Sequence, residues 1–284
     1  MASLLLAVAG GYILLLGLMF LFQNKLLFMP SSAMFQTPQN AGLPAEDLWI
    51  TTEDGIRIHG WYFPNESAEL VVILSHGNAG NISGRIGIAE TLLNSGAAVV
   101  MYDYRGYGQS EGKPTEAGLY MDIEAVVHHL KAEKGYSEND MVMYGRSLGG
   151  AVAAYAATQF NLRGLVLDSA FQNLRSMIRD VYPFVPTALA RYRFPTDEYL
   201  MQLEGLPIMI MHSPTDEIVS YEQGRALYDM IGQPKMFVDL RGGHNDNFFT
   251  SRDIIQQNWS AYIRGLCNRC GFPGRQNAEG RGQK

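Results

Sequence analysis

Residues 141–160 read MVMYGRSLGGAVAAYAATQF, a buried-strand pattern followed directly by a helix rich in small residues. At the junction, GRSLG (145–149) matches the pattern G-x-S-x-G. A serine between a strand and a helix lies on a sharp, strained turn, and the flanking glycines remove side chains that would clash there. Such a turn exposes the Ser147 hydroxyl, and the following helix supplies backbone N–H groups for a developing oxyanion. We therefore expect Ser147 to be a nucleophile; the alternative is an ordinary Gly-rich turn with a solvated serine.

Strand-like and helix-like segments alternate along the chain from residue 47 to residue 266. Continuous runs of β-branched residues and Met, typical of strands buried on both faces, occupy residues 71–77, 97–104, 141–147, 162–168, 207–213 and 235–240. Helical spacing occurs between them, in residues 82–94, 115–133, 148–160 and 221–231. Upstream, LWITTEDG and IRIHGWYFP predict a hairpin with Asp54-Gly55 as its turn. The alternation predicts an α/β protein with a mostly parallel eight-stranded sheet and helices on both faces.

Residues 172–205 interrupt this alternation, because they separate two predicted strands by more than one helix and its usual short connections. We interpret the interval as a small cap. It contains four aromatic candidates for an apolar cleft that binds an acyl chain: Tyr182, Phe184, Tyr192 and Phe194. The interval follows the predicted strand 162–168, and loops at the carboxyl ends of the strands build the binding site in an open α/β sheet. For each of these aromatics, packing of the cap onto the domain is the alternative.

The N-terminus is the compositional outlier, since residues 4–22 read LLLAVAGGYILLLGLMFLF without one charge. The run is long enough to span a bilayer, and it is apolar on all faces, unlike a core helix. No Lys or Arg precedes it, which favours a retained single-pass anchor over a cleaved signal peptide. Pro, Gly, Ser, Gln and Asn in the following stretch indicate a linker, assigned to residues 23–46. Lys25, just after the run, favours a cytoplasmic globular domain.

A serine hydroxyl is a weak nucleophile until a base takes its proton, so a histidine oriented by a carboxylate is required. The order that accompanies this motif is Ser, then acid, then His. Only His212 and His244 follow Ser147, and His244 lies in the loop RGGHNDN before the last helix. We expect His244 to be the base. Asp216, in HSPTDEIV, is the expected acid, and Asp168, in LVLDSA one strand earlier, is the alternative.

The segment HGNAGN (76–81) ends an early predicted strand, and its small residues let backbone N–H groups approach a substrate carbonyl. We expect the amides of Asn78 and Leu148 to form an oxyanion hole. His76 precedes the nucleophile and is expected to shape this loop through hydrogen bonds. Asp103 and Arg105, in YDYRGYGQS, are interpreted as scaffold, because pairing of arginine with carboxylates commonly holds such loops.

Composition and motifs argue against several other functions. A net charge of -6 without any Lys/Arg-rich run gives no footprint for nucleic acid. Around residues 107–114, a phosphate-binding loop would need Gly and Ser or Thr where the chain has Tyr and Pro, so no nucleotide partner is expected. No H-E-x-x-H occurs, and Cys267 and Cys270 form one C-x-x-C, too few ligands for structural zinc. We expect no metal and no cofactor, and we interpret residues 267–284 as a flexible tail.

Five segments, HGNAGN, YDYRGYGQS, GRSLGG, HSPTDEIV and GGHND, together resemble one branch of the α/β-hydrolases. These are single-pass proteins related to serine-aminopeptidase-like hydrolases and to the depalmitoylating α/β-hydrolase-domain proteins. The resemblance covers roughly residues 25–265, including the post-anchor segment KLLFMP. It implies the α/β-hydrolase fold and the site residues Ser147, Asp216, His244, Asn78 and Leu148. The chain lacks the N-terminal cysteine cluster of the depalmitoylating group.

Members of this branch are more often linked to hydrolysis of esters, thioesters or lipids than to peptide cleavage. The resemblance and the motifs therefore predict a membrane-anchored serine hydrolase that acts on an acyl ester or thioester at a bilayer. Two alternatives stay open, namely a serine peptidase and an anchored scaffold that kept the fold and lost the chemistry.

Overall fold

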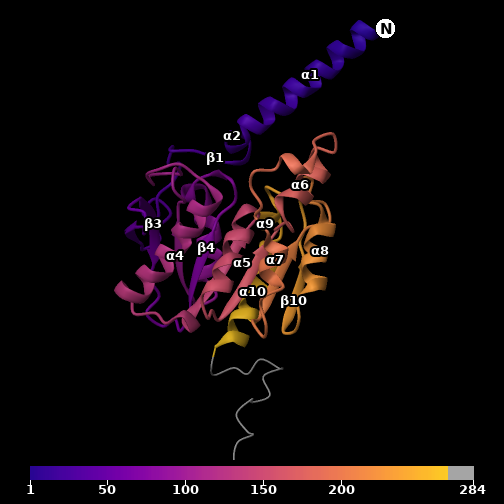
Figure 1. The fold of residues 1–284 in the computed structure, drawn as a ribbon. Helices are drawn as coiled ribbons and strands as arrows, with labels where there is room; N and C mark the ends of the chain where they lie inside the picture. Colours follow the sequence, from indigo (N-terminus) through magenta and orange to yellow (C-terminus); the bar gives the residue numbers. More distant parts are fainter. Residues whose placement is uncertain (268–284) are drawn as a thin grey trace, which may run out of the picture.

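The computed structural model describes residues 1–267, which are built around an eight-stranded sheet (Figure 1). The strand order is β10-β9-β8-β7-β4-β6-β3-β2. The strands are β2 (Glu46–Thr51), β3 (Arg57–Phe63), β4 (Val71–Ser75), β6 (Ala98–Tyr102), β7 (Met141–Arg146), β8 (Gly164–Asp168), β9 (Ile208–His212) and β10 (Lys235–Asp239). Strand β3 pairs antiparallel with β2 and with β6, and the other pairs are parallel. The predicted sheet is confirmed, including the leading hairpin of β2 and β3.

The central strand β4 shows why the apolar runs are continuous. It lies between β6 and β7, and all five of its residues are buried. Val71 and Ile73 belong to one hydrophobic core, whereas Val72 and Leu74 belong to a second. Because successive side chains of a strand point to opposite faces, both faces of this sheet need an apolar cover.

Helices provide this cover on both faces. Those of the first core are α4 (Glu116–Glu133), α5 (Leu148–Gln159), α7 (Thr196–Leu200) and α8 (Tyr221–Met230). Those of the second are η1 (Ile82–Arg85), α3 (Ile86–Leu93), α9 (Asn247–Thr250) and α10 (Arg252–Leu266), and a short turn η2 (Glu138–Asp140) precedes β7. Because helices connect the parallel strands, the carboxyl ends of these strands meet at one edge of the sheet.

The long interval between β8 and β9 holds three short helical elements: α6 (Leu174–Val181), η3 (Thr187–Leu189) and α7. The last of these packs on α5 and α8 and so belongs to the body of the domain. By contrast, α6 and its following loop rise from the sheet on the side from which α1 extends (Figure 1). This raised part is the small cap expected from the length of the interval.

The four cap aromatics occupy two different environments. Phe194 has no exposed surface, and its ring centroid lies 6.1 Å from that of Phe28. The ring of Tyr192 also meets Phe28, at 5.4 Å. Tyr182 and Phe184, in the loop after α6, are exposed. Two of the aromatics therefore pack the cap onto the domain, as the alternative interpretation had it, and the other two face outward.

Helix α1 (Ala2–Leu21) extends away from the globular part of the chain, and none of its residues is buried (Figure 1). Its length and its mean hydropathy of 2.5 are sufficient to cross a membrane. Two contacts connect it to the cap. The Tyr12 hydroxyl donates a hydrogen bond of 2.5 Å to the carbonyl of Phe184, and the Arg191 guanidinium lies 5.6 Å from the ring centroid of Phe20.

Residues 23–30 pack on the domain, which corrects the interpretation of residues 23–46 as a linker. Helix α2 (Gln23–Leu27) follows α1 directly. The side-chain amide of Gln23 donates to the carbonyl of Leu189 in the cap at 2.7 Å. Amide side chains are typical of linkers, but that of Gln23 finds a partner on the folded domain.

The contact continues beyond α2. Phe28 is buried in the core, and β1 (Met29–Pro30) pairs with β5 (Ala79–Gly80) in a separate two-stranded sheet. The side chain of Asn78 donates to the Leu27 carbonyl at 3.0 Å. The segment after α1 therefore lies against the loop that follows β4, at the carboxyl edge of the main sheet.

Candidate active site

Ser147 lies between β7 and α5 with φ 52° and ψ −118°, a backbone conformation that residues other than glycine rarely adopt. The flanking glycines are explained by backbone atoms of this same protein that approach closely. A Cβ on Gly145 would lie 2.4 Å from the Gly149 carbonyl oxygen, and a Cβ on Gly149 would lie 2.0 Å from the Ser75 carbonyl oxygen. Both glycines are therefore required by the turn, as the pattern G-x-S-x-G predicts.

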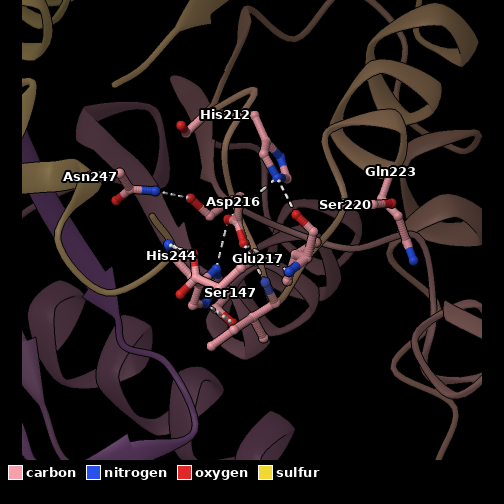
Figure 2. A network of polar contacts seen from close by, with 12 residues as sticks. Ser147, His212, Asp216, Glu217, Ser220, Gln223, His244 and Asn247 are labelled. Carbon is pink, nitrogen blue, oxygen red and sulfur yellow. Dashed lines mark hydrogen bonds and ion pairs between the residues drawn. The ribbon is translucent and has the colours of Figure 1, made fainter. Parts of the chain in front are cut away.

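The structure brings the three predicted triad residues together (Figure 2). His244 Nε2 lies 3.1 Å from Ser147 Oγ, and His244 Nδ1 lies 2.7 Å from Asp216 Oδ2. The three residues follow β7, β9 and β10, whose carboxyl ends lie at the same edge of the sheet. This is the arrangement of nucleophile, base and orienting acid that acyl transfer through a serine requires.

Asp216 is held as an anion by its surroundings. Its Oδ1 accepts hydrogen bonds from the amides of Ile218, at 3.0 Å, and Val219, at 2.8 Å. Burial alone would raise the pKa of Asp216, but the hydrogen bond and charge of His244 and these two amides outweigh it, so the pKa is lowered. His212 Nε2 lies 3.5 Å from the same carboxylate, and burial lowers the pKa of this histidine. His212 therefore packs behind the acid as a neutral ring.

The alternative acid, Asp168, has other partners. Its Oδ2 accepts hydrogen bonds from Arg146 Nη1, at 2.5 Å, and from the Tyr144 hydroxyl, at 2.7 Å. Its Oδ1 accepts the Ser169 hydroxyl at 2.9 Å. Because this carboxylate is buried among these donors, the geometry favours Asp216 as the partner of His244.

Two residues that sequence reasoning missed hold the loop that carries His244. Arg146 Nη2 donates to the His244 carbonyl at 2.5 Å and to Asn247 Oδ1 at 2.8 Å. On the other side, the Glu217 carboxylate accepts the His244 amide at 2.9 Å. The sequence offered a signal for Arg146 only: it is an arginine at the variable position of G-x-S-x-G, and Asp168, its ion-pair partner, ends the neighbouring strand.

A cavity of about 400 Å³ opens beside this site. Ser147 and His244 line it together with Asn78 and Leu148, the two residues expected to supply oxyanion amides. The structure therefore places the predicted nucleophile, base and oxyanion residues around one space in which a substrate carbonyl can lie.

Most of the remaining cavity wall is apolar, and its larger side chains include Leu27, Met29, Ile88, Phe171, Met177 and Phe248. None of the four cap aromatics is part of this wall, so the expectation that they form the cleft is wrong. The side chains that take their place come from the segment after α1, from α3, α6 and α9, and from the loop after β8. Leu27 and Met29 were missed because their sequence position gives no sign that this segment docks here.

The expected scaffold contacts are present in the loops that follow β4 and β6. The His76 ring contacts the Gly77 carbonyl at 2.7 Å through Nδ1 and so shapes the loop after β4. Arg105 pairs with Asp54 at 2.6 Å and with Asp122 at 2.9 Å. The hydrogen bond from Arg105 lowers the pKa of Asp54 to about 2.

The metal and tail predictions concern other parts of the chain. Within residues 1–267, no group of three or more His, Cys, Asp or Glu side chains is arranged to hold a metal ion. Cys267 lies at the end of α10. Cys270 and the rest of the predicted tail lie outside the described residues.

Comparison with known proteins identifies the family. A family model described as "Serine aminopeptidase, S33" matches residues 66–196. A protein of Saccharomyces cerevisiae named "Uncharacterized membrane protein YNL320W" is 34% identical over 269 residues, which cover 88% of this chain and 90% of that protein. The chain belongs to the α/β-hydrolases. Protein bem46 of Schizosaccharomyces pombe is 28% identical to this α/β-hydrolase over 234 residues, 78% of each chain.

Solved structures share the fold of this α/β-hydrolase. The Pyrococcus furiosus esterase Pf2001 aligns with a TM-score of 0.71 at 20% identity, over 84% of this chain and 97% of that one. An α/β-hydrolase from Vibrio vulnificus aligns with a TM-score of 0.66 at 22% identity, over 78% and 81%. At these identities the likeness concerns the fold, and it confirms the fold class predicted from the sequence.

Proposed function

We propose that this α/β-hydrolase is a membrane-anchored serine hydrolase that cleaves carboxylic esters or thioesters of acyl compounds. One observation carries the proposal: Ser147 Oγ, the His244 ring and the Asp216 carboxylate are joined by contacts of 3.1 and 2.7 Å at the wall of an apolar cavity. A serine that is only structural has no need of a histidine held in this position by an ionised carboxylate.

The proposed reaction has two steps. His244 Nε2 takes the hydroxyl proton as Ser147 Oγ attacks the carbonyl carbon, and His244 then protonates the alcohol or thiol as its bond to the acyl carbon breaks. Water, deprotonated by His244, attacks the acyl-enzyme and releases the carboxylic acid. Asp216 keeps the imidazole in the required tautomer and stabilises the imidazolium.

The oxyanion of each tetrahedral intermediate needs hydrogen-bond donors. We assign this role to the backbone amides of Asn78 and Leu148, because both residues line the cavity beside Ser147. A donor of this kind contributes about 2.7–4 kcal/mol to transition-state stabilisation.

The composition of the wall supports an acyl substrate. Burial of a methylene group is worth about 0.8 kcal/mol, and side chains such as Leu27, Met177 and Phe248 provide the apolar surface for it. The cavity lining contains no Asp or Glu that would recognise a peptide amine. Ester or thioester cleavage is therefore preferred to the peptidase activity that the name of the family model mentions.

We also propose that α1 is a single-pass anchor. Its residues are apolar and unburied, and the relative from Saccharomyces cerevisiae is named a membrane protein. Leu27 and Met29 place the cavity wall immediately after the helix, so substrate can enter from the bilayer surface. Lys25 supports a cytoplasmic position for the domain.

A fluorophosphonate probe tests the proposal, since it reacts covalently with activated serines. The full chain in detergent is expected to be labelled, and to hydrolyse 4-nitrophenyl esters, whereas Ser147→Ala is expected to do neither. Ser67→Ala is the control, because Ser67 is exposed and lies outside the cavity. If circular dichroism shows a folded wild-type protein that neither reacts with the probe nor cleaves esters, the silent-scaffold alternative holds instead.

A further inference from the structure

Arg85 occupies an unusual place for an arginine of this α/β-hydrolase. It is the last residue of η1, close to the loop that carries Asn78, and it is only partly exposed. Its guanidinium folds back to donate a hydrogen bond to the carbonyl of Ala79 and lies 3.6 Å from the position that a Cβ on Gly80 would occupy. The side chain thus lines the same cavity as Ser147.

The charges around this cavity are unbalanced. Its lining includes Arg85 and Arg146 but no Asp or Glu. The charge of Arg146 is matched by Asp168 at 2.5 Å. Among residues 1–267, no carboxylate forms an ion pair with Arg85, although the protein as a whole carries a net charge of -6. An excess positive charge therefore remains at the cavity wall.

The surroundings of Arg85 make that charge costly. Burial and then the charge of Arg146 lower the pKa of Arg85, against the opposing influence of Asp103. One oxygen of Asp103 has other partners, since Oδ1 accepts the Ile82 amide at 2.9 Å and lies 3.4 Å from His76 Nε2. Its buried Oδ2 has no hydrogen-bond partner among residues 1–267. An arginine nevertheless stays protonated in proteins, so an anion brought into the cavity would be stabilised by it.

We infer that Arg85 binds an anionic group of the substrate, a phosphate or a carboxylate, while the acyl chain lies against the apolar wall. The inference rests on the proposed function and adds the class of substrate: an acyl ester or thioester that carries a negative charge. The guanidinium fork suits such groups because it can donate two parallel hydrogen bonds. The bond to Ala79 leaves other N–H groups of the guanidinium available for this contact.

A purely structural role for Arg85 makes a different prediction. The bond to Ala79 braces the loop that holds Asn78, so loss of the side chain could disturb the oxyanion site alone. In that case neutral and anionic substrates would be affected alike. The preference for anionic over neutral substrates, measured as a ratio of affinities or of kcat/KM values, therefore distinguishes the two roles of Arg85.

Direct binding is the first test. The full chain carrying Ser147→Ala, in neutral detergent micelles, is titrated by calorimetry with a monoacylglycerol and with the 1-acyl-glycerol 3-phosphate of the same chain length. A hemisuccinate of that monoacylglycerol provides the carboxylate arm. We expect at least one anion to bind about tenfold or more tighter than the neutral lipid, and the stronger of the two identifies the group.

Variants then assign the preference. Adding Arg85→Gln is expected to abolish it, and Arg85→Lys to restore part of it, because the charge returns without the fork. Arg179→Gln is the matched control, since Arg179 is exposed on α6 and lies outside the cavity. Equal binding of all three lipids by the Ser147→Ala protein, or a preference that survives Arg85→Gln, would overturn the inference.

Turnover separates this inference from the function on which it rests. In protein with Ser147 intact, the ratio of kcat/KM for the anionic and neutral esters is expected to fall about tenfold with Arg85→Gln. Absence of turnover on every ester would contradict the proposed function, whereas the binding preference of the Ser147→Ala protein would still decide the role of Arg85. An equal loss on both substrates would leave Arg85 as a brace of the loop and reject the anion subsite.

Discussion

Arg146, the residue directly before Ser147, donates a hydrogen bond of 2.5 Å to the backbone carbonyl of His244. The same guanidinium pairs with the buried carboxylate of Asp168. One side chain thus connects the turn that carries the proposed nucleophile to the loop that carries the proposed base.

Replacement of Arg146 with Met is expected to lower the free energy of unfolding by about 3–5 kcal/mol, because it leaves Asp168 buried without its counter-ion. Turnover should also fall, since the His244 loop loses a donor. Urea unfolding and ester hydrolysis by the folded fraction measure the two effects.

The double variant Arg146→Met, Asp168→Leu separates two effects of Arg146: compensation of the buried Asp168 charge and positioning of His244. It removes both buried charges, so stability is expected to recover relative to Arg146→Met. Turnover is expected to stay low, because the bond to the His244 carbonyl is still missing. Full recovery of turnover would show that Arg146 does not position His244.

Replacement of each candidate acid by Asn, in separate variants, tests the triad assignment. Asp216→Asn is expected to reduce kcat on the order of 10³–10⁴-fold, because an amide favours the wrong tautomer of His244. Asp168→Asn is expected to lower stability with a much smaller loss of kcat per folded molecule. The assignment fails if Asp168→Asn is the more damaging change for turnover when both variants are shown to be folded.

Asp216 also makes stability depend on pH in a defined direction. Its pKa is lowered in the folded protein, so the ionised carboxylate favours folding. This contribution is fully present above about pH 4, the ordinary carboxyl range, and is lost as the pH falls through the lowered folded value. The difference in unfolding free energy between wild type and Asp216→Asn should therefore shrink below that pH, and denaturant titrations at several pH values measure it.

Truncation separates the proposed anchor from the docked segment that follows it. Removal of residues 1–22 is expected to give a soluble protein that still cleaves short esters, because no cavity residue lies in α1. Removal of residues 1–30 also deletes Phe28, Leu27 and Met29, and should lower the melting temperature and the turnover of longer esters. Identical behaviour of the two truncated proteins would contradict the role given to the docked segment.

The residues that line the cavity, and not the cap aromatics, should determine how turnover depends on the acyl length of the substrate. We expect kcat/KM to rise with acyl length over short and medium 4-nitrophenyl esters, and Met177→Ala to flatten that rise, because Met177 lies in the wall. Phe184→Ala serves as the control, since Phe184 is exposed and outside the cavity. A flat length profile in the wild-type enzyme would reject the acyl cavity.

Much of the fold followed from local pattern. Continuous apolar runs between helix-length segments predict a mostly parallel sheet with two covered faces. A strand that is apolar on both faces must be buried on both, and the helices between the strands provide the cover. The turn at Ser147 could also be predicted, since glycine is the residue that fits the close approach of backbone atoms at positions 145 and 149. Chain order alone also indicated His244 and favoured Asp216 over Asp168.

Tertiary structure decided what lies around these residues. Leu27 and Met29 reach the cavity because their segment docks on the domain, where β1 pairs with β5 and Phe28 is buried. The pairing joins segments about fifty residues apart, which no local period encodes. Likewise, Phe194 packs inward and Phe184 outward, although their local sequence contexts are alike in aromatic and proline content. Burial and ion pairing are set by long-range packing, so the sequence by itself predicted the fold and the residues of the proposed triad, and the folded chain decided the walls and charges around them.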